Sequence, residues 1–174
     1  RVAHFSGDGD ADRPGVAVQV FRLDPNANGT DTDFGNQVDC ATVTNGDFSN
    51  WDDYVAFGVP DDNTTYNCGP AATDRAETSH LTSATPAAGG VIEGHKVYLW
   101  AATNANKTVN TNIRSRVGVE YEEKANPNLA LAYNSRHQTF PRRPGGAVWT
   151  QADIAALEIG VLVFAGNNEN AKCS

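Results

Sequence analysis

The chain has 174 residues, and 21 acidic against 13 basic side chains give it a formal net charge of −8. This length fits one domain with a hydrophobic core of its own. The acidic excess argues against nucleic acid or an anionic membrane as a partner, because both bind basic surfaces. No run of about 18 apolar residues occurs, so the sequence predicts no membrane-spanning helix.

The predicted elements are short β-strands between loops rich in Gly, Asn, Asp and Thr. Strands are expected at residues 16–23, 38–44, 54–58, 95–103, 112–122, 129–134 and 160–165. In the fourth, Val97, Leu99 and Ala101 are expected on one face and Tyr98 and Trp100 on the other. A basic cluster after the sixth is expected in a solvated loop; it comprises Arg136, His137, Arg142 and Arg143.

The segment 112–122 has the clearest alternation of apolar and charged residues, which is typical of an antiparallel strand with one solvated face. The residues expected on its buried face are Ile113, Val117, Val119 and Tyr121. Those expected on its solvated face are Arg114, Arg116, Glu120 and Glu122.

Near the C-terminus the pattern changes to a short helix at 150–158, with Thr150 as N-cap and Asp153 completing a variant of the capping box. Leu157 lies on its apolar side, Gly160 is expected to end it, and Trp149 is expected to anchor it against the sheets. These structural anchors indicate a closing element rather than a catalytic motif.

The elements together predict an all-β fold, a two-sheet antiparallel β-sandwich or jelly roll with one short helix near the C-terminus. Within this single domain we distinguish an acidic, Asn- and Gly-rich segment at 1–35 from the sandwich proper at 36–174. The first segment is a candidate for an assembly arm or for calcium-binding loops.

Two acidic stretches supply the oxygen ligands that calcium prefers. Asp8, Asp10 and Asp12 alternate in one, and the other has the spacing of the first half of a calcium loop, at Asp24, Asn26 and Asn28, with Asp31 and Asp33 beyond. The Glu expected at the twelfth position of that loop is replaced by Gly35. The alternative is a turn in which Asp and Asn serve the backbone.

Three cysteines, Cys40, Cys68 and Cys173, fit no zinc motif and are disulfide candidates, with plain thiols as the alternative. Asn28, Asn63 and Asn106 begin glycosylation sequons. The chain contains no Met, which favours a processed or trimmed product. The tryptophans Trp51, Trp100 and Trp149 serve either as core anchors or, where exposed, as stacking surfaces for sugars.

No nucleophile elbow, phosphate-binding loop or dinucleotide-binding motif occurs, and the histidines have no metal-ligand spacing, so we expect a protein that is not an enzyme. Adjacent acids such as Asp52 and Asp53, or Asp61 and Asp62, are expected to be solvated, because neighbours on a strand point apart and do not flank a cleft.

Residues 40–165 resemble the jelly-roll, concanavalin-like domain of tailed-bacteriophage structural proteins. The resemblance depends on Trp149-Thr150, Ala155-Ala156-Leu157 and Glu158-Ile159-Gly160-Val161, with Ile113–Val117, Pro141–Gly146 and Asp61–Tyr66 upstream. It implies a structural subunit or decoration of a virion or extracellular filament, with copies of itself or a coat protein as partners. The alternative is a calcium-assisted carbohydrate-binding module or lectin with surface glycan as its partner. Either function would place the protein outside the cell or on a virion surface.

Overall fold

A computed structural model describes residues 20–21, 23, 25–36, 67–69, 75–82, 90–103, 109–126, 128–129, 131–164 and 171–173. Sheet A consists, in spatial order, of β1 (Pro25–Thr32), β4 (Arg75–Leu81), β9 (Leu157–Val163), β6 (Thr111–Val117) and β7 (Glu120–Asn126). Sheet B consists of β2 (Gly35–Asn36), β3 (Asn67–Gly69), β10 (Ala171–Cys173), β5 (His95–Thr103) and β8 (Asn134–Phe140). The single described helix is α2 (Gln151–Ala155).

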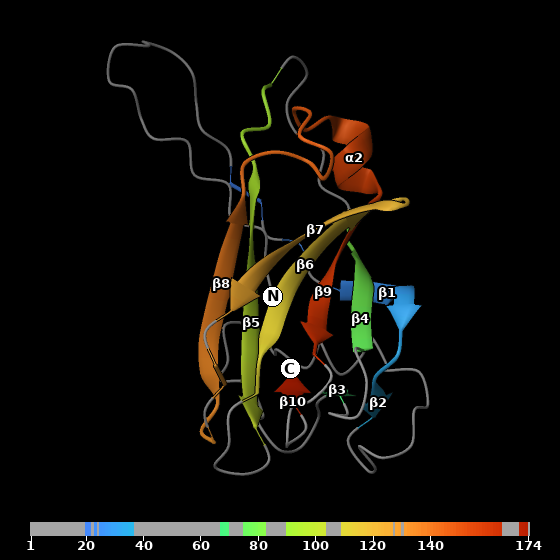
Figure 1. Ribbon diagram of the computed structural model, residues 1–174. Helices are drawn as coiled ribbons and strands as arrows, with labels where there is room; N and C mark the ends of the chain where they lie inside the picture. The colour runs from blue at the N-terminus through green and yellow to red at the C-terminus, as the bar shows by residue number, and fades with distance from the viewer. Residues whose placement is uncertain are drawn as a thin grey trace, which may run out of the picture.

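All strand pairs are antiparallel, and the two sheets pack face to face with α2 at one end of the sandwich (Figure 1). Most successive strands lie in opposite sheets, as they do in jelly rolls. The exceptions are β2 and β3, which are both in sheet B, and β6 and β7, which are both in sheet A. The predicted all-β sandwich with one short C-terminal helix is therefore confirmed. Residues 25–36 contribute a strand to each sheet, so the sandwich includes part of the acidic N-terminal segment.

The core lies between the sheets and follows the period-two alternation of the strands. The prediction for β5 is confirmed: Val97, Leu99 and Ala101 are buried, whereas Tyr98 and Trp100 lie on the other face, half-buried. The buried apolar cluster consists of Leu23, Phe34, Leu81, Val97, Leu99, Ala101, Val109, Ile113, Val117, Leu129, Phe140, Trp149, Ile154, Leu157, Ile159, Val161 and Val163.

The predicted strand at 112–122 is wrong, because this segment forms a hairpin. Gly118, with φ of +61°, and Val119 make the two-residue turn that joins β6 to β7. Ile113 and Val117 are buried as predicted, but Val119 lies at the turn and Tyr121 lies on β7. Both are exposed, because the turn interrupts the alternation that a single strand would have continued.

Other predicted boundaries also move. Residues 129 and 131–133 lie outside any strand. The strand begins at Asn134, so Arg136 and His137 lie on β8 rather than in a loop. Of segment 16–23, the described residues Val20, Phe21 and Leu23 are outside any strand, and the predicted strands at 38–44 and 54–58 lie outside the described residues. Strand β8 was missed because it is an edge strand whose composition is largely polar.

The C-terminal closing element is confirmed, with shifted boundaries. Thr150 Oγ1 accepts a hydrogen bond from Asp153 N at 3.2 Å, and Asp153 Oδ2 accepts one from Thr150 N at 2.9 Å. The buried Trp149 donates from Nε1 to Phe140 O at 3.1 Å. The helix ends at Ala155, so Leu157 begins β9, and the prediction that Gly160 ends the helix is wrong.

We expect Thr150→Ala to lower the free energy of unfolding by about 1 kcal/mol, since it removes both the N-cap acceptor and a partner of Asp153. Urea denaturation measures this effect. Gln151→Ala, an exposed change one residue later, is the control and should have almost no effect. Equal midpoints for the two variants would contradict the role of the capping box.

Candidate functional site

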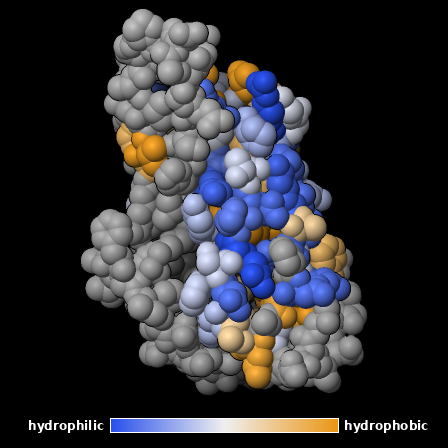
Figure 2. All heavy atoms as spheres, turned by 90° about the vertical axis from the view of Figure 1, so that its left-hand side faces the viewer, coloured by the Kyte–Doolittle hydropathy of each residue, from blue (hydrophilic) through white to orange (hydrophobic). Residues whose placement is uncertain are grey.

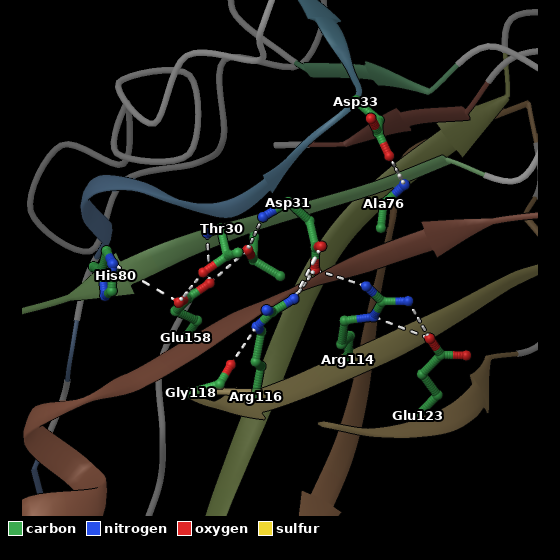
Figure 3. A network of polar contacts seen from close by, with 11 residues as sticks. Thr30, Asp31, Asp33, Ala76, His80, Arg114, Arg116, Gly118, Glu123 and Glu158 are labelled. Carbon is green, nitrogen blue, oxygen red and sulfur yellow. Dashed lines mark hydrogen bonds and ion pairs between the residues drawn. The ribbon is translucent and has the colours of Figure 1, made fainter. Parts of the chain in front are cut away.

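The outer face of sheet A, the face turned away from sheet B, carries a continuous network of polar side chains. Strand register places Thr78 of β4 and Arg114 of β6 in one row with Glu123 of β7, and Glu158 of β9 beside Arg116 of β6 in the next. Figure 3 shows Arg114, Arg116, Glu123 and Glu158 converging with Thr30 and Asp31, which β1 brings over this face. Alternation along each strand puts these groups on the side opposite the core.

Asp31 holds the middle of this network. Its carboxylate accepts hydrogen bonds from Arg114 Nη1 at 2.6 Å and from Arg116 Nη1 at 3.0 Å, and Arg114 Nε donates to Glu123 Oε1 at 2.9 Å. Arg114 is only 8% exposed. Burial alone would lower the pKa of Arg114, but its bonds to Glu123 and Asp31 outweigh burial and raise the pKa. The two guanidinium charges are therefore balanced by two carboxylates.

Glu158 binds Thr30, the residue of β1 that directly precedes Asp31. Its oxygens accept hydrogen bonds from Thr30 N and Thr30 Oγ1, each at 2.7 Å, and from Thr78 Oγ1 at 2.8 Å. Burial alone would raise the pKa of Glu158, but these bonds and the nearby His80 outweigh it and lower the pKa. A side chain at Gly29 would collide with Thr78 and Glu158, so glycine permits this close approach of β1. The network thus fixes β1 on the sheet.

Beside this polar network, Tyr121 lies on the same outer face and is 55% exposed. The Arg114 guanidinium carbon lies over its ring, 4.5 Å from the ring centre. Asn112 Nδ2 donates to Glu123 Oε2 at 3.2 Å, and Glu123 also binds Arg114, so an amide and a carboxylate are linked to the guanidinium that packs on the ring. An exposed aromatic ring with fixed polar groups beside it is suited to bind a ligand that has one apolar face and hydroxyl groups at its edge.

The sequence prediction missed this site because it assigned Tyr121 to the buried face. The sequence did contain an indication of the hairpin turn, because Gly118 and Val119 separate two alternating segments. A glycine at that position permits the hairpin turn, and the turn makes Tyr121, Glu123 and Ala125 share a face with Arg114 across the pair.

The predicted calcium residues are only partly described. Asp31 binds the two arginines, Asp33 Oδ2 accepts a hydrogen bond from Ala76 N at 3.4 Å, and Asn26 and Asn28 are exposed on β1. Residues 25–32 form a strand, where a calcium loop was expected. Asp8, Asp10, Asp12 and Asp24 lie outside the described residues. Within the described part of the chain, no three His, Cys, Asp or Glu side chains form a group suited to a metal.

The remaining predicted positions are dispersed. Cys68 on β3 pairs in register with Lys172, and Cys173 on the neighbouring β10 pairs with Asn67, whereas Cys40 lies outside the described residues. Of the sequon asparagines, Asn28 is exposed on β1, whereas Asn63 and Asn106 lie outside the described residues. Trp51 also lies outside them. Trp149 is a core residue, whereas Trp100 lies on the outer face of sheet B.

Among the described residues, Glu77 and His95 are ionisable side chains that are fully buried between the two sheets. Burial raises the pKa of Glu77 to about 8, although the hydrogen bond from Phe34 N, at 3.1 Å, opposes this effect. Burial lowers the pKa of His95 to about 3, and its ring stacks on Phe140 with the centres 5.0 Å apart. Neither side chain is exposed to solvent, so neither belongs to the outer-face site.

Comparisons with known proteins assign no family: no family model and no curated protein matches the chain. Among solved structures, the chain is similar to one titled "Family 16 Carbohydrate Binding Module-2", with 8% identity and a TM-score of 0.39. The match covers 68% of this chain and 75% of that one. In the described part of the chain, no helix is both long and apolar enough to cross a membrane.

Proposed function

We propose that this protein is a non-catalytic glycan-binding module whose binding site is the outer face of β6 and β7. The observation that carries the proposal is the Tyr121 ring, more than half exposed and held from one side by the Arg114 guanidinium. A pyranose presents a face of C–H groups, which pack on an aromatic ring, and hydroxyl groups at its edge, which form hydrogen bonds. Asn112 and Glu123 supply the hydrogen-bonding groups.

The fixed geometry of these groups supports the proposal. Arg114 is held by both Asp31 and Glu123, and Glu123 is held in turn by Asn112. A binding surface that is already ordered loses little side-chain entropy when the ligand arrives. The contacts of β1 with the sheet therefore support the site, since Asp31 of β1 positions the Arg114 guanidinium against the Tyr121 ring.

The test is Tyr121→Ala, with binding to a panel of soluble polysaccharides measured by affinity electrophoresis and calorimetry. We expect the affinity to fall roughly tenfold or more, as is usual when the central aromatic residue of a binding site is truncated. Tyr121→Phe keeps the ring and should retain most of the affinity. Val119→Ala, two residues away and 88% exposed in the parent chain, is the matched control.

Equal affinities for Tyr121→Ala and Val119→Ala would place the glycan elsewhere, and no binding to any glycan by the wild-type protein would refute the function. Far-ultraviolet circular dichroism of each variant checks that the fold is intact.

The alternative is the assembly function expected from the sequence, that of a coat or filament subunit. Val91 and Val148 favour it, since they flank the bridge between Ile92 and Trp149 and are 86% and 60% exposed. If the segment before β1 is an assembly arm, removing residues 1–15 should abolish oligomers and leave a folded monomer, as measured by light scattering. A monomeric full-length protein would contradict this alternative.

The edges of the sheets also bear on assembly. Edge strands β7 and β8 lie beside each other, where Lys124 Nζ donates to Thr139 O and Gln138 Nε2 donates to Ala125 O, each at 2.6 Å. These bonds occupy carbonyl groups that an added strand would need. Figure 2 turns this side toward the viewer, and its described residues are mostly hydrophilic. We therefore do not place an assembly contact on this edge.

A further inference from the structure

The outer face of sheet B carries a second group of aromatic side chains, on β5 and β8. Tyr98 and Trp100 alternate with the buried residues of β5, and His137 pairs in register with Tyr98. The rings of Tyr98 and His137 lie 5.6 Å apart, and those of Trp100 and Tyr133 lie 6.3 Å apart and nearly parallel, at 15°. Tyr98 and His137 form a cross-strand pair, and Tyr133 lies directly before β8, so the rings of this group are ordered relative to one another.

Among the described outward residues of β5 and β8, the formal charge is that of one cation, Lys96. The described residues that alternation places outward are Lys96, Tyr98, Trp100 and Ala102 on β5 and Ser135, His137 and Thr139 on β8. None of them is a carboxylate, although the chain as a whole has a net charge of −8. Lys96 Nζ lies 5.3 Å from the centre of the Tyr98 ring, so a cation is held directly beside the aromatic group. By contrast, the outer face of sheet A balances its two arginines with Asp31 and Glu123.

We infer that the outer face of β5 and β8 is a second binding site, for sugars that carry a carboxylate, such as a uronate chain. The inference rests on the proposed glycan-binding function and extends it to the opposite sheet. The Tyr98 and Trp100 rings provide the stacking surface, and Lys96 pairs with the sugar carboxylate. Because the described outward residues of β5 and β8 include no carboxylate, they do not repel an acidic chain.

The two sites are separate in space. Packed sheets are about 10 Å apart, and the two binding groups project outward from opposite sheets. One sugar unit therefore cannot contact Tyr121 and Trp100 together. A molecule with both sites filled holds two chains, and it can link an acidic polysaccharide to a neutral one.

The experiment measures binding of two probes by calorimetry at low salt, namely a neutral oligosaccharide selected from the panel above and oligogalacturonate. Four proteins are compared: wild type, Tyr121→Ala, Trp100→Ala and Lys96→Gln. We expect Trp100→Ala to weaken oligogalacturonate binding roughly tenfold and to leave the neutral probe unaffected. Lys96→Gln keeps every ring and should weaken only the acidic probe, about fivefold, as expected for one solvent-exposed ion pair. Tyr121→Ala should have the reverse selectivity.

Each result decides between the two proposals. If the neutral sugar binds through Tyr121 and oligogalacturonate does not bind, the second site is refuted and the proposed function stands. If Tyr121→Ala abolishes binding of both probes, there is one site and the inference is wrong. If Trp100→Ala and Lys96→Gln both leave oligogalacturonate affinity unchanged, the acidic site does not lie on β5 and β8. If neither probe nor any other glycan binds the wild type, both proposals fail.

Discussion

Gly160→Ala is expected to lower the free energy of unfolding by about 3 kcal/mol or more, because the added methyl group has no space. Gly160 lies in the middle of β9, which is hydrogen-bonded to β4 on one side and to β6 on the other. A Cβ there would collide with the carbonyl oxygen of Glu77 and would lie 2.8 Å from Thr78 Cα. Both obstacles are backbone atoms of a strand, so relief requires β4 to move.

The control for this prediction is Gly118→Ala. Gly118 has φ of +61°, but no atom lies within 4 Å of a Cβ built there. Alanine at that turn is strained only through its backbone, at a cost of about 1 kcal/mol. Urea denaturation of both variants separates the two effects. A smaller loss for Gly160→Ala than for Gly118→Ala would show that β4 and β9 can separate easily, which would contradict the tight pairing at the centre of sheet A.

Gly160 also illustrates what local sequence patterns can predict. A glycine after an apolar helical turn is typical of a helix end, and the capping box at Thr150 and Asp153 was correctly identified from its spacing. The requirement for glycine comes instead from Glu77, which is 83 positions earlier in the chain and adjacent only after sheet A has formed. Such a contact between strands leaves no trace in the local pattern.

Strand prediction succeeded where apolar residues alternate with outward-facing ones and failed where the strand is largely polar. The segment His95–Thr103 alternates between the core and the outer face, and both its boundaries and its faces were predicted. By contrast, β8 is an edge strand with little apolar content, and β4 buries Glu77, Thr78 and Ser79 in place of apolar residues. Hydrophobic periodicity cannot identify such strands, because their polar groups are satisfied or enclosed by distant residues.

The candidate site depended on tertiary structure to a greater degree. Asp31 belongs to a segment that the sequence assigned to calcium, and its contacts with Arg114 and Arg116 span more than 80 residues. Tyr121 was placed on the wrong face because one turn was missed. Trp100, in contrast, was correctly placed opposite the buried face of β5, since the alternation there is continuous. Residue types were therefore recognised more reliably than the groups they form.

The second large effect concerns Glu77 and the pH dependence of stability. Glu77 is fully buried in the sandwich, and burial, with the nearby charges of Asp33 and Asp31, raises its pKa from 4.5 to about 8 despite the bond from Phe34 N. The folded protein therefore keeps this carboxyl protonated at pH values where the unfolded chain releases the proton. Because the unfolded state binds fewer protons in this range, stability must fall as the pH rises.

The contribution of Glu77 to stability is complete below pH 4.5, decreases by about 1.4 kcal/mol for each pH unit above it, and stops decreasing above pH 8. Glu77→Gln should abolish this slope, since glutamine has nearly the shape of the protonated acid and its amide oxygen can still accept the bond from Phe34 N. The variant should resemble the wild type near pH 4.5 and exceed it by several kcal/mol at pH 8.5.

Urea denaturation from pH 4.5 to 8.5 measures this effect as the difference between the two proteins, which cancels the titration of all other groups. Ser79→Ala is the control, because Ser79 is a buried neighbour on the same face of β4 and cannot ionise. Its stability should differ from the wild type by the same amount at every pH. If the difference for Glu77→Gln is equally constant, Glu77 is charged within the folded protein, and the sandwich must admit water or a compensating cation between its sheets.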